Sequence, residues 1–195
     1  MFDKDRFIED CRAAVAEGRE AQKAVREIVA EAVADPAGIA RELGAPEHAG
    51  VTPLYSGPDL TAIHFVWAPY MTLLPHNHNI FAVIGIYAGR EDNLFWRKLP
   101  EARPDGAQIE AAGAESLGPG QVATLGRDII HSVANPLGKM TSTIHVYGGD
   151  FFNPPQPRSQ WDHESLTEEP WDMDNTHATF RAAEARYRAG LAAGG

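Results

Sequence analysis

Two histidines one residue apart, His76 and His78, lie in residues 75–79, whose sequence is Pro-His-Asn-His-Asn. On an extended strand successive side chains alternate between faces, so both imidazoles point to the same side. Imidazole nitrogens are common ligands of divalent transition metals. The spacing therefore predicts half of a metal site, which needs a third ligand from elsewhere in the chain.

His131 is the candidate for the third ligand. It lies in a predicted strand over residues 129–134, with a glycine-containing turn before it and Asn135-Pro136 after it. In a small antiparallel barrel such a downstream strand can pair beside the strand that carries His76 and His78. We therefore expect the three imidazoles to meet in one site.

A site of three neutral imidazoles leaves a divalent metal with its full charge and with open coordination positions. Such a site favours anionic ligands such as a thiolate and leaves room for dioxygen beside them. A structural metal site would instead be closed by a fourth ligand, for which His64 and His145 are the candidates. Neither histidine has the spacing of a ligand pair, so the open site is favoured.

A predicted strand over residues 141–147 carries a second group of chemically capable side chains. Thr143, His145 and Tyr147 share one of its faces at period two. A hydroxyl, an imidazole and a phenol in a row can hydrogen-bond to oxygen and move a proton, so we predict a catalytic role for all three. The alternative is that His145 and Tyr147 only pack and satisfy each other's hydrogen bonds.

The elements that must position these residues change in character along the chain. Residues 1–45 are rich in alanine and charged residues, with apolar residues at helical spacing, which predicts an N-terminal helical cap. Residues 153–195 contain a Pro- and Trp-rich stretch and then a helical pattern, which predict a wrapping segment followed by a short helix over 176–192. We expect one structural domain overall.

Residues 46–152 contain short apolar or alternating runs separated by Gly, Pro, Asn and Asp. Many short strands without intervening helices predict a mainly β domain, an antiparallel sandwich or small barrel. The predicted strands are residues 51–55, 61–67, 79–87, 93–98, 108–112, 121–125, 129–134 and 141–147.

The composition excludes several classes of function. With 27 acidic and 17 basic residues the formal charge is −10, which disfavours binding to nucleic acid. Cys11 is the only cysteine, which excludes an intrachain disulfide and cysteine-based metal sites. The sequence has no signal-peptide pattern and no apolar run of about 20 residues. We expect a cytoplasmic protein with no membrane partner.

The histidine motifs resemble those of the cupin superfamily, whose fold is a double-stranded β-helix barrel. His76 and His78 match the first cupin motif, and His131 with Asn135 matches the second. The first motif normally adds a glutamate ligand three to four residues after the second histidine, where this chain has apolar residues. In this respect the chain is similar to the cysteine dioxygenase group, which binds iron through three histidines.

Residues 143–147, Thr-Ile-His-Val-Tyr, resemble the Ser-x-His-x-Tyr strand of thiol dioxygenases, and Trp67 is placed as in that group. The resemblance implies Fe(II) as cofactor, a small thiol and O2 as substrates, and a sulfinate as product. Residues 51–56 lack the arginine with which cysteine dioxygenases clamp the substrate carboxylate, and no cysteine follows the histidine pair. We therefore expect substrate contacts from Tyr55, Trp67 and Arg158, with the thiol left open.

Two other functions are compatible with the same residues. A three-histidine metal could act on a non-thiol substrate, by C–C or C–H oxidation or by zinc-type hydration. A cupin without enzymatic activity could bind a small ligand and sense or store it. Metal content and oxygen uptake separate these alternatives, because only an oxygenase consumes O2 when its substrate is added.

Overall fold

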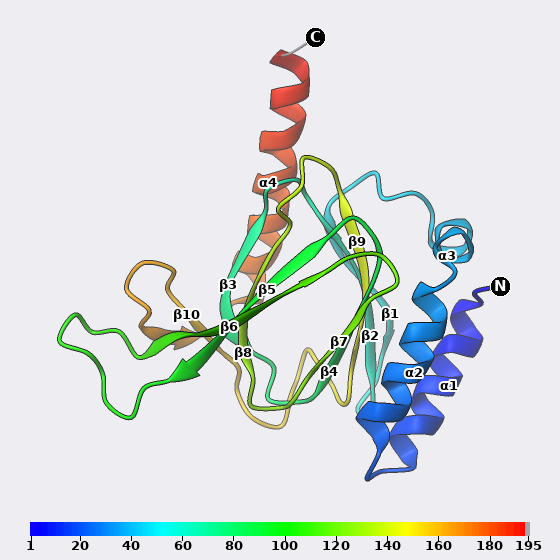
Figure 1. Ribbon diagram of the computed structural model, residues 1–195, viewed down its shortest axis with the longest axis horizontal. Helices are drawn as coiled ribbons and strands as arrows, with labels where there is room; N and C mark the ends of the chain where they lie inside the picture. Colours follow the sequence, from blue (N-terminus) through cyan, green and yellow to red (C-terminus); the bar gives the residue numbers. More distant parts are fainter. Residues whose placement is uncertain (194–195) are drawn as a thin grey trace.

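The computed structural model describes residues 1–193, and its strands form two facing antiparallel sheets (Figure 1). The strands are β1 (Gly50–Ser56), β2 (Thr61–Trp67), β3 (Thr72–Asn77), β4 (Ala82–Ala88), β5 (Glu91–Lys98), β6 (Ile109–Leu117), β7 (Val122–Leu125), β8 (Ile130–Ala134), β9 (Thr141–Tyr147), β10 (Ser159–Trp161) and β11 (Glu168–Pro170). One sheet has the order β1-β2-β9-β4-β7 and the other β11-β10-β3-β8-β5-β6. Strands β2-β9-β4-β7 thus face β3-β8-β5-β6, which is the jelly-roll arrangement of cupins. The predicted mainly β, cupin-type barrel is confirmed.

An N-terminal helical cap covers the outer face of the five-stranded sheet (Figure 1). Its helices are α1 (Lys4–Ala16), α2 (Ala21–Val33) and α3 (Pro36–Leu43). Helix α2 lies close to β4 because Gly85 has no side chain: a Cβ there would lie 2.5 Å from Val29 Cγ1 and 2.8 Å from Val33 Cγ1. Within the predicted helical cap, Gly18, with a φ of +85°, separates α1 from α2.

Strand β3 corrects the prediction around the histidine pair. The sequence predicted both histidines on an extended strand, although the strand range that it gave in this region began only at residue 79. Instead β3 ends at Asn77, so His76 lies on the strand and His78 follows it. The pairing of β3 with β8 shifts register between Leu73 and His76, a stretch that contains Pro75. A strand irregularity is a position where proline is tolerated, which explains why the bounds of β3 were not evident from the sequence pattern.

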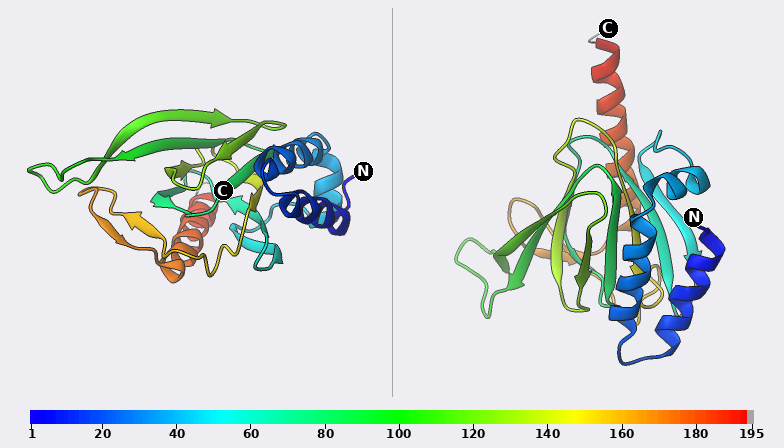
Figure 2. Two further views of the ribbon diagram at one scale, coloured as in Figure 1. Left: turned by 90° about the horizontal axis from the view of Figure 1, so that it is seen from below. Right: turned by 45° about the vertical axis from the view of Figure 1, so that its right-hand side comes forward.

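The segment after β9 returns to the six-stranded sheet, where β10 pairs with β3 and with β11. Neither β10 nor β11 was predicted. The final helix, α4 (Met173–Ala193), has 21 residues and is longer than the short helix expected over 176–192. Phe180 packs against Phe65 and Trp67 inside the barrel, whereas the end of α4 projects from the body (Figure 2). Over residues 1–193 no helix is both long and apolar enough to cross a bilayer.

Candidate metal centre

Three histidines from two neighbouring strands point into the barrel. His76 on β3 pairs in register with His131 on β8, and His78 follows the end of β3. The ring centroids of His76 and His131 are 4.6 Å apart, and His78 lies 5.0 Å from each. One ligand nitrogen from each ring lies within 4.8 Å of the other two, and all three side chains are buried. The residues singled out in the sequence therefore form a three-histidine metal site.

Hydrogen bonds leave a ring nitrogen of two of these histidines free for a metal. His76 Nδ1 donates to the Leu74 carbonyl oxygen at 2.8 Å, and His131 Nδ1 donates to Asn93 Oδ1 at 2.7 Å. His131 Nε2 is buried and has no hydrogen-bond partner in the described part of the chain. A buried nitrogen with an unshared electron pair is costly without a partner, and a metal ion supplies one. The residues present therefore fit a divalent metal.

Burial also keeps the three imidazoles in the protonation state that binds metals. Desolvation lowers the pKa of His76 to about 3, and it lowers the pKa of His78 and of His131 well below the ordinary value. The positive charge of Arg158 lowers these pKa values further. All three rings are thus neutral at neutral pH, and their lone pairs are available.

Neither candidate for a fourth ligand joins the three histidines. His64 lies on the face of β2 turned to the helical cap, where its Nε2 is 2.7 Å from the Tyr87 hydroxyl. His145 does face the site, but its Nδ1 lies 3.1 Å from the Tyr147 hydroxyl and its Nε2 lies 3.3 Å from Glu91 Oε2. Within residues 1–193 the metal-binding cluster contains three histidines and no fourth ligand, so the site is open.

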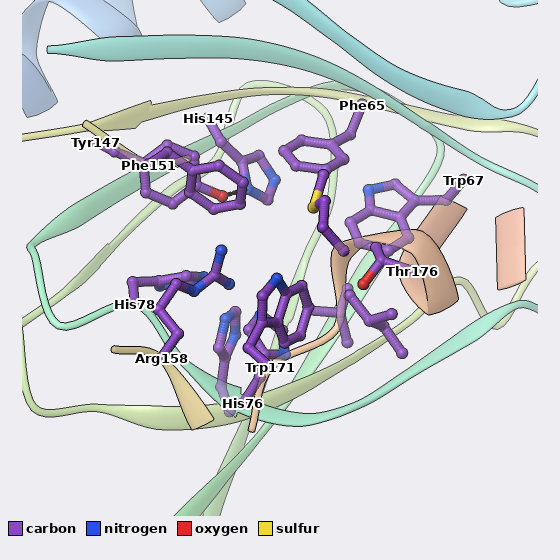
Figure 3. Close-up of a pocket in the computed structure, with 14 residues that line it drawn as sticks. Phe65, Trp67, His76, His78, His145, Tyr147, Phe151, Arg158, Trp171 and Thr176 are labelled. Carbon is purple, nitrogen blue, oxygen red and sulfur yellow. Dashed lines mark hydrogen bonds between the residues drawn. The ribbon is translucent and has the colours of Figure 1, made fainter. Parts of the chain in front are cut away.

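A cavity of about 20 Å³ lies beside the three histidines, inside the barrel. Figure 3 shows His76, His78 and Trp171 on one side of it, with His145 and Tyr147 on the opposite side. The cavity holds little more than one water molecule. The arrangement thus places a metal site in a small enclosure of aromatic rings, where electrostatic interactions are only weakly screened.

Arg158 reaches this cavity from the C-terminal segment (Figure 3). Its guanidinium carbon lies 4.3 Å from the ring centroid of Phe151 and 4.2 Å from that of Trp171, so two rings hold it in place. Its Nε donates to the Asn77 carbonyl oxygen at 2.9 Å, whereas its buried Nη2 has no partner among the described residues. Burial lowers the pKa of Arg158 to about 10, so the group remains a cation at neutral pH. Its free Nη2 can therefore bind an anion.

The structure separates Thr143 from the other two residues of its predicted row. His145 and Tyr147 both line the cavity and are hydrogen-bonded to each other. Thr143 is buried behind the lining, where its Oγ1 accepts a hydrogen bond from Trp67 Nε1 at 3.3 Å. Trp67 lines the cavity with its ring. The geometry therefore brings His145, Tyr147 and Trp67 to the site, and Thr143 contacts it only through Trp67.

Tyr55 lies away from the cavity, and this corrects the prediction that it contacts the substrate. Side-chain alternation from Val51, which packs on the inner core, would turn Tyr55 inward as well. A register shift between Pro53 and Tyr55 reverses the face. Tyr55 packs instead with the helical cap, where its hydroxyl donates to Asp59 Oδ1 at 3.3 Å. No arginine or tyrosine of β1 thus reaches the metal site.

Three residues at the site were not identified from the sequence: Glu91, Asn93 and Trp171. The Trp171 ring lies 4.9 Å from that of His76, centroid to centroid, although the two are far apart in sequence. The strand predicted here began only at residue 93, whereas β5 begins at Glu91, and both Glu91 and Asn93 are buried. A signal was present: Arg90 and Asp92 form an exposed ion pair on either side of Glu91, as alternation around an inward residue predicts.

No protein-family model matches the chain. Among solved structures, oxalate decarboxylase from Bacillus subtilis has 14% identity and a TM-score of 0.40 over 53% of this chain and 24% of that chain. An oxalate oxidase in complex with the substrate analogue glycolate has 14% identity and a TM-score of 0.40, over 54% of this chain and 53% of that chain. A conserved protein of unknown function from Streptococcus pyogenes has 14% identity and a TM-score of 0.38, over 50% of this chain and 70% of that chain.

The chain thus spans about a quarter of the decarboxylase and about half of the oxidase that it resembles. At this identity and this TM-score, no activity or metal is transferred from those proteins to this chain. What the strand order and the histidine cluster define is a cupin-type barrel with a three-histidine metal site.

Proposed function

We propose that the protein is a non-haem Fe(II)-dependent dioxygenase that oxidises a small thiol to a sulfinate. The observation that carries the proposal is the open site of three neutral imidazoles, because it leaves the charge of a divalent metal to be balanced by an anionic substrate. When bound by His76, His78 and His131, Fe(II) supplies a Lewis acid for the thiolate and the redox chemistry that O2 requires. The reaction RSH + O2 → RSO2H balances without an external reductant.

His145 and Tyr147 take up the proton that the thiol loses. Burial raises the pKa of Tyr147, so its hydroxyl is protonated in the resting site. The hydroxyl lies 3.1 Å from His145 Nδ1, so it can donate its proton there while its oxygen accepts the proton of the thiol. The transfer needs no water in the small cavity. Trp67 and Phe151 exclude solvent from the same space.

Arg158 favours a thiol that also carries a carboxylate. The guanidinium is buried beside the metal site with an unpartnered Nη2, and the cavity lining contains no carboxylate. A substrate carboxylate would satisfy the free N–H group and the charge together. Phe151, Arg158, Trp171 and Met173 also line an outer pocket of about 290 Å³, so the substrate enters from that side.

The proposal is tested by anaerobic metal analysis followed by oxygen uptake with a panel of thiols, with and without a carboxylate. Protein from iron-supplied cells is expected to contain about one iron ion per chain, as a single three-histidine site requires. Thiol and oxygen should then disappear in equal amounts, with a sulfinate found by mass spectrometry. Bound zinc without iron, or thiol binding without oxygen uptake, would refute the proposal.

Replacing Tyr147 by phenylalanine is expected to leave the metal content unchanged and to slow turnover by about 100- to 10,000-fold, the usual contribution of a proton-transferring group. The matched control is Tyr87→Phe, which removes a hydroxyl bonded to His64 outside the cavity. Steady-state oxygen uptake measures both variants. Equal rates for the two variants would show that the Tyr147 hydroxyl takes no part in the reaction.

A further inference from the structure

Glu91, the first residue of β5, is a buried carboxylate behind the metal site, with a relative exposure of 0%. Its Oε1 accepts a hydrogen bond from Asn93 Nδ2 at 3.0 Å, and its Oε2 lies 3.3 Å from His145 Nε2. Within residues 1–193 no lysine or arginine forms an ion pair with it. A buried carboxylate is costly unless a counter-charge and hydrogen bonds compensate it. A metal ion held by His131 would supply such a charge, because Asn93 links Glu91 to that ligand.

One arm of contacts joins Glu91 to the metal ligand His131. The Asn93 amide nitrogen faces Glu91, so its carbonyl oxygen faces the other way, toward His131 Nδ1 at 2.7 Å. An amide oxygen can only accept, so His131 carries its proton on Nδ1. The lone pair on Nε2, which has no other partner in the described chain, is then directed to the metal.

A second arm joins Glu91 to the proton-transferring pair. A carboxylate only accepts hydrogen bonds, so His145 carries its proton on Nε2, toward Glu91. Nδ1 then faces the Tyr147 hydroxyl, 3.1 Å away, and that hydroxyl can donate to it. The Tyr147 oxygen is thereby left as the acceptor that faces the cavity. A proton passed on by Tyr147 would bind to Nδ1, and the positive charge that it gives the His145 ring would lie beside the Glu91 carboxylate.

We propose that Glu91 is a positioning residue that sets the direction of the hydrogen bonds on both sides of the metal centre. Through Asn93 it holds His131 in the tautomer that binds the metal, and through His145 it sets the acceptor for Tyr147. Its negative charge offsets part of the charge that three neutral imidazoles leave on the metal. The inference rests on the metal site of the proposed function and not on the identity of the substrate.

The test is the substitution Glu91→Gln, which keeps the size of the side chain but presents an amide in place of an acceptor-only carboxylate. Zinc affinity of the metal-free protein, measured by competition with a chelator, is expected to fall by about 10- to 100-fold, as for other partners of metal-bound histidines. Glu115→Gln is the matched control, because Glu115 is exposed on the neighbouring strand β6, and its zinc affinity should equal that of the wild type.

The two arms are separated by three further variants. Asn93→Ala should weaken zinc binding as Glu91→Gln does, and the loss in the double variant should be smaller than the sum of the two single losses, because both changes act on the same contact to His131. Tyr147→Phe should leave zinc affinity unchanged, since it lies on the other arm. A fully additive loss in the double variant, or a loss in Tyr147→Phe, would contradict the proposed arrangement.

Thermal unfolding distinguishes positioning from a purely structural role. Bound metal stabilises the folded protein by an amount that grows with the logarithm of its affinity. Added zinc should therefore raise the Tm of Glu91→Gln by less than that of the wild type. The Tm of the metal-free variant should equal or exceed that of the metal-free wild type. A lower metal-free Tm with unchanged zinc affinity would overturn the proposal. Should Glu91→Gln fail to fold, Asn93→Ala decides, because it leaves the carboxylate in place. Loss of thiol oxidation alone would refute only the proposed function.

Discussion

Replacing His131 by alanine is expected to remove metal binding and oxygen uptake together. His131 supplies one of three ligands, and its Nε2 has no other partner in the described chain. Two imidazoles on their own do not hold a divalent ion against the competing water. Metal affinity should fall by more than about 100-fold, beyond the loss typical for an outer hydrogen-bonding partner. The measurement is metal content per chain, before and after dialysis against a weak chelator.

The His131 variant needs a control, because the side chain is buried and its loss also leaves a cavity. His131→Asn keeps a donor toward Asn93 Oδ1 but lacks Nε2, so it should lose the metal while folding is preserved. His64→Ala removes another buried strand histidine, from the capped face of β2, and should retain the metal. Metal retained by both His131 variants would show that the ligand assignment is wrong.

The metal ligands were predictable from the sequence because their signals are local. The shared direction of His76 and His78 depends only on three consecutive residues of extended backbone. The barrel was indicated by the short alternating or apolar runs of residues 46–152. The direct pairing of His76 with His131 could not be predicted from the sequence, because the register between two strands depends on the packing of the whole sheet. The irregularity between Leu73 and His76, which contains Pro75, obscured the bounds of the strand that carries the first ligand.

The remaining residues of the site depend on contacts that no local pattern encodes. Arg158 and Trp171 lie in a segment without periodicity, and they reach the cavity because β10 pairs with β3. Glu91 is buried within a run of three charged residues, and only the alternation with the exposed pair Arg90 and Asp92 distinguishes it from a surface residue. Tyr55 was misplaced because one irregularity in β1 exchanges the two faces of the strand. Small backbone irregularities thus decided which side chains meet.

Replacing Arg158 by methionine is expected to reduce kcat/KM about 10- to 150-fold for thiols that carry a carboxylate, as a lost charge-assisted hydrogen bond of about 1.5–3 kcal/mol predicts. Most of the loss should appear in KM, because the carboxylate contact is present before and during the reaction. Thiols without a carboxylate should react almost as before. Arg158→Lys keeps the charge without the planar fork of donors and should recover only part of the loss.

Arg158 also holds the backbone between two of the ligands, since its Nε donates to the Asn77 carbonyl oxygen. Arg127→Met is the matched control: Arg127 is exposed and donates to the Asn79 carbonyl oxygen at 3.3 Å on the same loop. If the loss in Arg158→Met came from a loosened loop, Arg127→Met would show part of it, and both classes of thiol would be affected equally. If Arg158 binds the carboxylate, kcat/KM should fall only for the thiols that carry a carboxylate. The metal affinity of Arg158→Met should then stay the same or rise, because a cation beside the metal has been removed.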